Sequence, residues 1–369
     1  MPPDVLVHLV EPAAWRAALD TGALRPPSLA EQGFVHLSTP QQVHLPAARL
    51  FPGRRDLVLL VVDPARLPDP VRWAPGVPGD PPGTRFPHLH GPLPVAAVVA
   101  VVPYRPPAEP VLPRPDDALG RALALGLSVR TRRAAEVRDV PGGVAVLDPA
   151  FPYSRDDNGL VLSEPVDAGT VEATTTDVAA DAGWPHRVAT LTWPGAGAVA
   201  RELAARGWQA DELLVMARPA TTPPPGRRAE VVDQRELHDL WERSWRRDLP
   251  AGEADLDEVV AQLVGREHRN DRVVAVTDLA VRAEGRVVSA GQLRVDGATA
   301  AIESLTTDPA ARGRGHGDAV LAAALDHAAA AGCDLVVLEA AAADWPRHWY
   351  ARRGFVPVGS TWEVSANRT

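Results

Sequence analysis

Lysine is absent from the 369 residues, so all 38 basic side chains are arginines. This bias, together with abundant Ala, Pro and Val, is typical of a GC-rich bacterial genome. The formal net charge is -9, and an acidic balance does not favour binding to a phosphate backbone or to an anionic membrane surface. We therefore expect no nucleic-acid partner and no membrane partner.

Cysteine is nearly absent as well. The single Cys333 excludes an internal disulfide framework and a Cys-based zinc cluster, and we interpret it as a small core residue. Long hydrophobic runs are also missing: the longest, around 94–102, is far short of the ~20 residues that cross a bilayer. No apolar stretch follows a basic start at the N-terminus. We expect a cytoplasmic protein.

Proline is abundant and concentrated in two stretches, 105–115 and 219–226. Such segments form extended, semi-rigid connectors. A length of 369 residues suggests two or three domains at about 150 residues each. We predict three units joined by two linkers: 1–104, linker 105–115, 116–218, linker 219–228, and 229–369.

Hydrophobic periodicity predicts the elements of each unit. The first is a small α+β domain with a helix at 12–21 and strands at 5–10, 34–37, 57–62 and 95–102. The second has a helix at 198–206 and strands at 143–147, 190–192 and 212–217. The third begins with helices at 235–246 and 255–266 and strands at 272–282, 286–295 and 299–306. It continues with helices at 315–331 and 345–353 and strands at 335–339 and 356–364.

The segment 305–321 carries the clearest chemistry. A strand runs into a loop of Arg and Gly and then into the first turn of an amphipathic helix. In Arg312-x-x-Gly315-x-Gly317, the glycines allow close approach of a ligand to the backbone, and the helix start offers unpaired N–H groups at the positive end of the dipole. This pattern predicts a pyrophosphate cradle.

The pattern L-x-x-x-P-x-x-R-G-x-G-x-G at 305–317, after three strands and before W-Y-A-R-R-G-F at 349–355, resembles the GNAT acetyltransferase superfamily over about 229–364. The resemblance implies an α/β (α+β) fold, a GNAT-type mixed sheet with flanking helices, and acetyl-CoA as cosubstrate. It implies that backbone amides of the loop hold the pyrophosphate and that the strand before the loop lines the pantetheine arm. The cofactor-binding positions are then Leu305, Thr306, Thr307, Arg312, Gly313, Arg314, Gly315, His316, Gly317 and Asp344.

Asp344 stands where the family commonly has asparagine. It is either a contact to the cofactor arm or a cap for the helix that begins at Trp345. Tyr350, four residues before Gly354, occupies the family's place for the tyrosine that protonates the departing thiolate. A phenol is a usable proton donor to such a thiolate, whereas the alternative is a space-filling tyrosine beside Trp349.

Glu303, on the strand before the loop, is the best placed general base. Strict alternation along this strand puts Glu303, Leu305 and Thr307 on one face. The alternatives are a solvent-facing carboxylate or an anchor for the substrate amine. Glu339, at the end of the next strand, is a second candidate base.

The second unit has no Arg-Gly loop. Asp157-Asn158-Gly159-Leu160, His186-Arg187-Val188 and the ending from Gly207-Trp208 to Met216 resemble the N-terminal portion of tandem acetyltransferases. The resemblance implies a degenerate GNAT-like unit with a structural or substrate-shaping role. Asn158 has a simpler interpretation as a turn residue.

The first unit contains Gly33-Phe34-Val35-His36-Leu37-Ser38-Thr39 and Arg85-Phe86-Pro87-His88-Leu89-His90-Gly91. These phrases resemble the domain-of-unknown-function 952 family over residues 4–104, whose members are distantly similar to ADP-ribosyltransferase-like folds. The resemblance implies that His36 holds the ribose of NAD. The alternative is that His36 and His88 are satisfied core residues. Because the histidines are dispersed, we expect no metal site.

The leading hypothesis is an N-acetyltransferase that transfers an acetyl group from acetyl-CoA to an amine of a small molecule or peptide, by direct attack in a ternary complex. The alternative is an acyl-CoA-binding sensor or scaffold, with ADP-ribosyltransferase-like nucleotide binding in the first unit. The acidic run 253–258 is either an attractor of cationic amines or a solvated helix face. The sequence does not define the acceptor or the oligomeric state.

Overall fold

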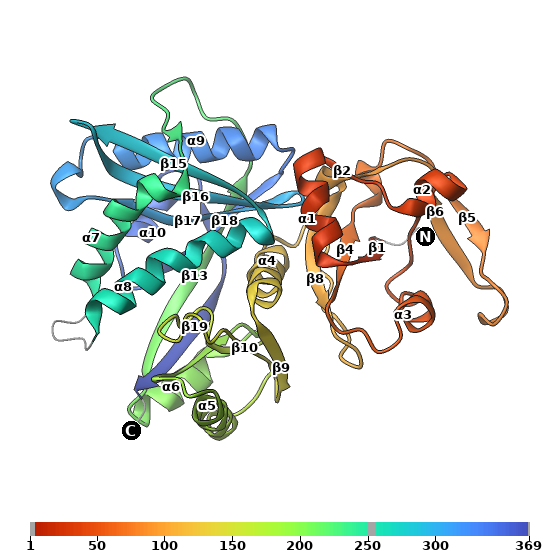
Figure 1. Ribbon diagram of the computed structural model, residues 1–369, viewed down its shortest axis with the longest axis horizontal. Helices are drawn as coiled ribbons and strands as arrows, with labels where there is room; N and C mark the ends of the chain where they lie inside the picture. The colour runs from red at the N-terminus through yellow and green to blue at the C-terminus, as the bar shows by residue number, and fades with distance from the viewer. Residues whose placement is uncertain (1–3, 250–254, 368–369) are drawn as a thin grey trace.

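The computed structural model describes residues 4–249 and 255–367. Two bodies are visible in Figure 1: the N-terminal unit on one side, and a larger body in which the second and third units are joined. The last described residues of the chain lie at the lower end of the larger body in this view. No helix within these described ranges is long and apolar enough to cross a membrane.

The N-terminal unit is built from short elements around three small sheets, ordered β1-β4-β8, β3-β6-β5 and β2-β7. Its helix α1 follows the predicted bounds because Pro12 stands in the first turn and Gly22, at φ 77°, ends it in the left-handed region. The predicted strand at 95–102 instead begins at Val98, after a single 3-10 turn. The elements are β1 (Leu6–Val10), α1 (Pro12–Thr21), β2 (Ala23–Leu24), α2 (Pro27–Gln32), β3 (Val35–His36), α3 (His44–Leu50), β4 (Leu57–Val62), β5 (Val71–Pro75), β6 (Arg85–Leu89), β7 (Leu93–Pro94) and β8 (Val98–Tyr104).

The second unit contains the predicted elements and four that were not predicted: α4, β9, β11 and α5. Its elements are α4 (Ala118–Arg133), β9 (Glu136–Val140), β10 (Gly143–Leu147), β11 (Gly159–Leu162), α5 (Ala168–Ala182), β12 (His186–Leu191), α6 (Gly197–Ala205) and β13 (Gln209–Pro219).

The third unit follows the predicted order of elements closely, with one further short strand, β14. Its elements are β14 (Glu230–Val231), α7 (His238–Asp248), α8 (Leu256–Gly265), β15 (Ala275–Ala283), β16 (Arg286–Asp296), β17 (Thr299–Thr307), α9 (His316–Ala330), β18 (Leu335–Ala341), α10 (Pro346–Ala351) and β19 (Val356–Asn367). A 3-10 helix at Arg266–Arg272 connects α8 to β15.

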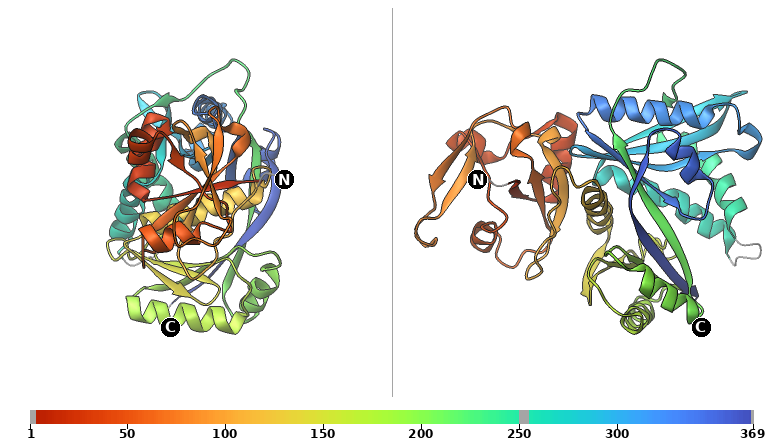
Figure 2. Two further views of the ribbon diagram at one scale, coloured as in Figure 1. Left: turned by 90° about the vertical axis from the view of Figure 1, so that its right-hand side faces the viewer. Right: turned by 180° about the vertical axis from the view of Figure 1, so that it is seen from behind.

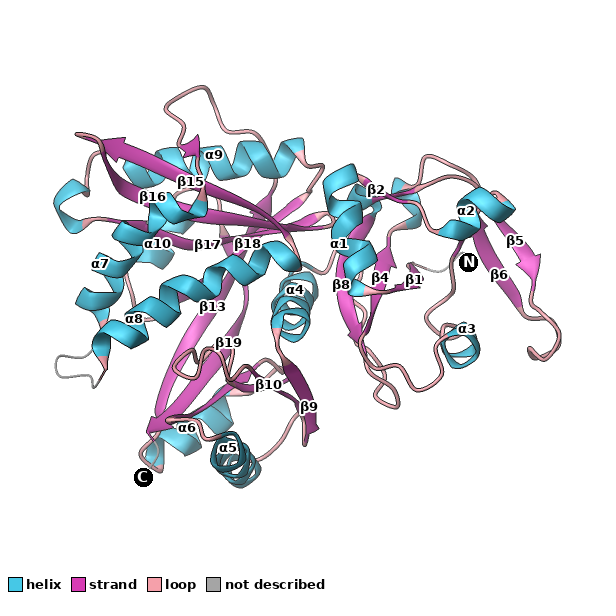
Figure 3. Ribbon diagram, viewed as in Figure 1, coloured by secondary structure: helices cyan, strands magenta, loops and turns pink. Residues whose placement is uncertain are grey.

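One 11-stranded mixed sheet runs through the second and third units, in the order β14-β15-β16-β17-β18-β13-β19-β12-β11-β10-β9. The units exchange strands: β13 lies between β18 and β19, and β19 lies between β13 and β12. Figure 3 shows these two long strands connecting the upper and lower parts of the sheet. The predicted mixed sheet with flanking helices is confirmed. The predicted boundary between the second and third units, at 218–229, stays a prediction, because one continuous sheet runs through both units.

The N-terminal unit docks on the turn between β16 and β17. The Ala298 N–H donates to the Val98 carbonyl at 2.7 Å, and the Thr299 hydroxyl donates to the Val99 carbonyl at 2.8 Å. A Cβ on Gly297 would lie 2.2 Å from the Val98 oxygen, so only glycine permits this approach. The right view of Figure 2 shows the first body side by side with the larger one.

Candidate active site

The central feature of the site is an opening between two strands. β17 and β18 run parallel and pair only from Thr299–Ala301 to Leu335–Val337. Beyond these residues, no pairing joins the two strands in the described chain, so the last part of β17 has one open edge. Its backbone groups on that edge are free to bind an extended ligand.

A β-bulge lies in β17 at the point where the strands part. Ser304 has a φ of 52°, and the pairing with β16 shifts so that Glu303 lies opposite Gln292 and Thr306 lies opposite Ala290. The predicted strict alternation is therefore wrong. The extra residue puts Glu303 on the same face as Thr306, while Leu305 packs against the opposite core beneath α9.

The bulge also decides which backbone groups face the opening. The Asp308 N–H donates to the Val288 carbonyl at 2.8 Å, and the Thr306 carbonyl accepts the Ser289 hydroxyl at 3.0 Å, so both point to β16. Alternation then places the N–H and C=O of Leu305 and Thr307 on the open edge. Of the three predicted pantetheine-lining residues, the structure thus presents the backbones of two to the opening.

The Arg-Gly loop follows this edge directly. Gly313 and Gly315 have φ values of 73° and 75°, and a Cβ on either would meet no atom within 4 Å. No backbone hydrogen bond is made by the N–H groups from Gly313 to Asp318 within the described residues. A run of unpartnered amides around an open turn at a helix N-terminus is a good fit for a diphosphate.

Side chains of the loop are arranged differently from its backbone. The Arg312 Nε donates to the Thr307 carbonyl at 3.2 Å, and the Arg314 side chain is exposed. His316 is 6% exposed, its Nδ1 lies 3.1 Å from the Arg227 guanidinium, and burial lowers its pKa. Only the backbone of His316 is therefore positioned for a ligand at this loop.

Helix α10 is fixed to the first turn of α9. Arg353 forms an ion pair with Asp318 and lies with its guanidinium carbon 3.8 Å from the centre of the Trp349 ring. The same ring lies 3.4 Å from the position of a Cβ on Gly317. The next residue, Tyr350, is buried in the core beneath α9, where its ring meets Trp349 and Phe355 edge-on.

Tyr350 lies close enough to Glu303 for the carboxylate to affect the phenol. Burial, and then the carboxylate of Glu303, raise the pKa of Tyr350 to about 12, so the phenol stays protonated at neutral pH. Burial raises the pKa of Glu303 as well, although Arg294 opposes this effect. Glu303 and Tyr350 are far apart in the sequence, so their proximity could not be predicted from it. The opening between β17 and β18 brings them near each other.

Two other predicted acids lie nearby. Burial raises the pKa of Glu339, and its Oε1 accepts the Thr361 hydroxyl at 3.1 Å. Asp344 is exposed, and its Oδ1 accepts the Trp345 N–H at 2.7 Å. The helix begins at Pro346 rather than at Trp345, and no side chain caps it. Of the two readings of Asp344, the helix cap is therefore not seen, because its carboxylate binds the N–H of Trp345, which precedes the helix.

A cavity of about 260 Å³ adjoins the bulge on the face of the sheet that α7 covers, opposite to the face that α9 covers. Helix α7 contributes residues at helical spacing, Trp241, Ser244, Trp245 and Asp248, and β17 contributes Ser304, Leu305 and Thr306. Trp241 is buried, and its indole N–H has no hydrogen-bond partner among the described residues. Sequence analysis missed this cavity, although the spacing of the two tryptophans was a signal for one helix face.

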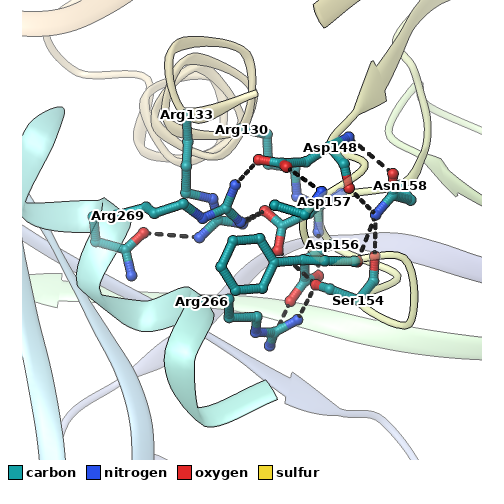
Figure 4. Close-up of polar contacts among 12 residues, drawn as sticks. Arg130, Arg133, Asp148, Ser154, Asp156, Asp157, Asn158, Arg266 and Arg269 are labelled. Atoms are coloured by element: carbon teal, nitrogen blue, oxygen red, sulfur yellow. Dashed lines mark hydrogen bonds and ion pairs between the residues drawn. The ribbon is translucent and has the colours of Figure 1, made fainter. Parts of the chain in front are cut away.

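A buried ionic network connects the loop 148–158 of the second unit to the third unit (Figure 4). Asp157 binds Arg133 at 2.7 Å and Arg269 at 2.6 Å, and Asp156 binds Arg266 at 2.9 Å. Asn158, 1% exposed, accepts the Asp148 N–H at 2.9 Å and donates to the Phe151 carbonyl at 2.7 Å. It therefore organises the whole loop rather than a single turn.

The N-terminal histidines form a separate cluster. The His88 ring stacks on Phe34 at 4.0 Å, and the His36 ring meets both edge-on at 4.8 Å and 5.0 Å. Burial lowers the pKa of both histidines. Within the described residues, no group of three or more His, Cys, Asp or Glu side chains is arranged to hold a metal ion.

Comparisons with known proteins agree with this geometry. Residues 234–355 match the model of the "Acetyltransferase (GNAT) family", and residues 9–101 match the model of the "Protein of unknown function (DUF952)". No curated protein matches the chain.

Three solved structures are similar to all or part of this chain. A functionally unknown conserved protein from Staphylococcus epidermidis is 13% identical with a TM-score of 0.51, and the match covers 64% of this chain and 95% of that one. A GCN5-related N-acetyltransferase from Kribbella flavida is 17% identical with a TM-score of 0.47, covering 68% and 96%. A protein from Caulobacter crescentus is 32% identical with a TM-score of 0.25, covering 29% and 94%.

The family match identifies a GNAT-type domain in the C-terminal part of the chain. The chain carries a domain of the acetyltransferase (GNAT) family at 234–355 and, before it, a domain of the DUF952 family at 9–101.

Proposed function

We propose that this protein uses acetyl-CoA to acetylate an amine of a small molecule or peptide, by direct attack in a ternary complex. The observation that carries the proposal is the open edge of β17 beyond Ala301, which leads straight into the unpartnered amides of the α9 N-terminus. This arrangement suits a ligand that joins an extended amide-bearing arm to a diphosphate.

In this proposal, the backbone amides of Gly313, Gly315 and Gly317 hold the diphosphate, while Arg312 fixes the loop through the Thr307 carbonyl. The exposed side chains of Arg312 and Arg314 add positive charge. The N–H of Thr307 and the C=O of Leu305, both on this edge, hold the arm. Acetyl-CoA supplies an activated acetyl thioester at the end of that arm.

The same edge supplies the chemistry. The amine nitrogen attacks the thioester carbonyl carbon, and the N–H of Leu305 stabilises the negative charge that develops on its oxygen. Glu303 accepts the proton lost by the amine, and its raised pKa makes it a stronger base than an ordinary carboxylate. When the carbon–sulfur bond breaks, Tyr350 gives its proton to the thiolate. Holding amine and thioester together contributes about 7 kcal/mol or more in well-oriented cases.

The acceptor reaches this edge from the α7 side, where the cavity of about 260 Å³ adjoins Ser304 and Thr306. This volume lies just below the range of ~300–1,000 Å³ typical of ligand pockets. A compact amine, or a single amino-terminal residue of a peptide, therefore fits the site.

The test is a continuous assay of free thiol release by the purified full-length protein. Acetyl-CoA is supplied with a panel of small aliphatic and aromatic amines, amino acids, and short peptides with free N-termini. We expect amine-dependent turnover with compact members of the panel. Saturable binding of acetyl-CoA without turnover on any amine would instead favour the sensor alternative.

A further inference from the structure

A cavity of about 700 Å³ lies in the N-terminal unit, separate from the acetyltransferase site. It is formed between α1 and α3, over a floor made by β1. Its volume is within the range of ~300–1,000 Å³ that is typical of small-molecule sites.

The walls of this cavity are apolar and partly exposed to solvent. On α1 they are Ala14, Ala17 and Ala18, spaced at three and four residues, so they form one helix face. The opposite wall includes Leu50, a residue that is 62% exposed, and Phe51. Apolar groups that face each other across an open cavity gain free energy when a ligand covers them.

The floor offers an open strand edge. Val7 exchanges two hydrogen bonds of 2.9 Å with Ser38, so its backbone groups point away from β4. Because alternate residues of a strand point the same way, the N–H and C=O of Leu9 also point to this side. No hydrogen bond joins Leu9 to the facing His36 in the described chain, although both residues line the cavity. A donor and an acceptor therefore stand side by side on the floor.

His8 adds an acceptor to the same floor. Its Nδ1 lies 2.7 Å from the His36 carbonyl, which only accepts, so Nδ1 carries the proton. Burial lowers the pKa of His8, so the ring is neutral. Its Nε2 is then left as an acceptor.

The lining is not built like the phosphate cradle at α9. Glu11 and Arg25 are exposed, and Glu11 is held by Arg54 at 3.0 Å. The lining contains no glycine, whereas the diphosphate cradle at α9 is built around glycines. His36 lines the cavity, but its ring is packed edge-on against Phe34 and His88. The cavity thus differs from the nucleotide site implied for His36.

We propose that this cavity is a binding site for a compact, uncharged, planar amide, either a lactam or a primary carboxamide. The amide N–H donates to the Leu9 carbonyl, the amide oxygen accepts the Leu9 N–H, and the flat ring lies between the alanine face of α1 and the Leu50–Phe51 wall. This proposal does not depend on acetyl transfer.

The test is an NMR titration of the full-length protein with 2-pyridone, a planar lactam. N-methyl-2-pyridone is the matched ligand, because it has nearly the same shape but no N–H. We expect saturable binding of 2-pyridone and binding of the methylated form weaker by about tenfold or more, since one buried hydrogen bond is lost. Equal affinity of the two ligands, or no saturable binding of 2-pyridone, would overturn the proposal.

Two variants locate the site. Ala17→Phe fills the cavity from an exposed helix position and is expected to abolish 2-pyridone binding. Ala13→Phe adds the same ring to an exposed residue of α1 outside the lining and is expected to leave binding unchanged. Thermal unfolding checks that both variants fold. Binding that survives Ala17→Phe, or AMP binding tighter than 2-pyridone in the same cavity, contradicts the proposal.

Discussion

The indole Nε1 of Trp15 in the N-terminal unit donates a hydrogen bond of 2.7 Å to the Oδ1 of Asp296 in the acetyltransferase unit. Both residues are buried, and the second carboxylate oxygen of Asp296 forms an ion pair with Arg132 of α4. One carboxylate therefore joins elements of all three predicted units. The N-terminal unit is an integral part of the folded body rather than a tethered module.

This junction predicts a large loss of stability when the carboxylate is removed. Asp296→Ala leaves Arg132 buried without its partner, and we expect the free energy of unfolding to fall by about 3–5 kcal/mol. Trp15→Phe removes one hydrogen bond and is expected to cost about 1–3 kcal/mol. Urea denaturation measures both. Asp239→Ala, which breaks the exposed pair with Arg243, is the control and should change stability by less than about 1 kcal/mol.

Substitution of Gly315 allows the effect of backbone strain to be distinguished from a direct effect on acetyl-CoA binding. Gly315→Glu puts a side chain at φ 75° and a negative charge at the diphosphate cradle, so we expect the Kd for acetyl-CoA to rise about tenfold or more. Gly285→Glu is the matched control, since Gly285 has φ 78° and equally open surroundings. Both variants should lose similar stability, about 1–2 kcal/mol, in thermal unfolding. Equal acetyl-CoA affinity of the two variants would remove the loop from the binding site.

We predict that substitution of Tyr350 slows the chemical step without weakening the binding of acetyl-CoA. Tyr350→Phe keeps the ring contacts to Trp349 and Phe355 but removes the proton donor. We expect kcat to fall by about 10²- to 10⁴-fold, with the KM for acetyl-CoA little changed. Tyr104→Phe, in the N-terminal unit, is the control for the loss of a buried phenol. A kcat of Tyr350→Phe equal to that of the wild type would make Tyr350 a packing residue.

The pH dependence of kcat/KM distinguishes the two candidate bases. A base acts when deprotonated, so activity is lost as the pH falls through its pKa, and burial places the pKa of Glu303 above its usual range. We expect the acid limb of the profile to lie above the ordinary glutamate pKa of about 4.3. Glu303→Gln should lower kcat and remove this limb, while Glu339→Gln should retain it. The reverse pattern would assign the base to Glu339, whose pKa burial also raises.

Local patterns predicted much of the fold. Helix α1 and strand β4 have the predicted bounds, because Pro12 and Gly22 punctuate the helix and the strand is a continuous apolar run. The order of elements after Gln234 was also predicted, since the hydrophobic period changes clearly from helix to strand. Helix α4 was not, because its buried face includes Arg121, which is held by Asp334 and Thr299. Helix α5 is rich in Thr, which has a low helix propensity.

The site was predicted only where its parts are close in sequence. The Arg-Gly loop and the helix start adjoin each other, so their pattern indicated the cradle. The bulge at Ser304, the opening between β17 and β18, and the exchange of β13 and β19 depend on pairing between distant strands. No local period encodes such registers. The N-terminal cavity was missed for the same reason, because α1 and α3 approach only in the folded protein.

The most direct test of the account is mass analysis of the acceptor after incubation with acetyl-CoA and the full-length protein, together with initial rates over both substrate concentrations. We predict an acetylated amine formed in equal amount to free thiol, double-reciprocal plots that intersect, and loss of product with Gly315→Glu but not with Gly285→Glu. Thiol release without an acetylated amine, or parallel double-reciprocal plots, would contradict direct transfer at the open edge of β17.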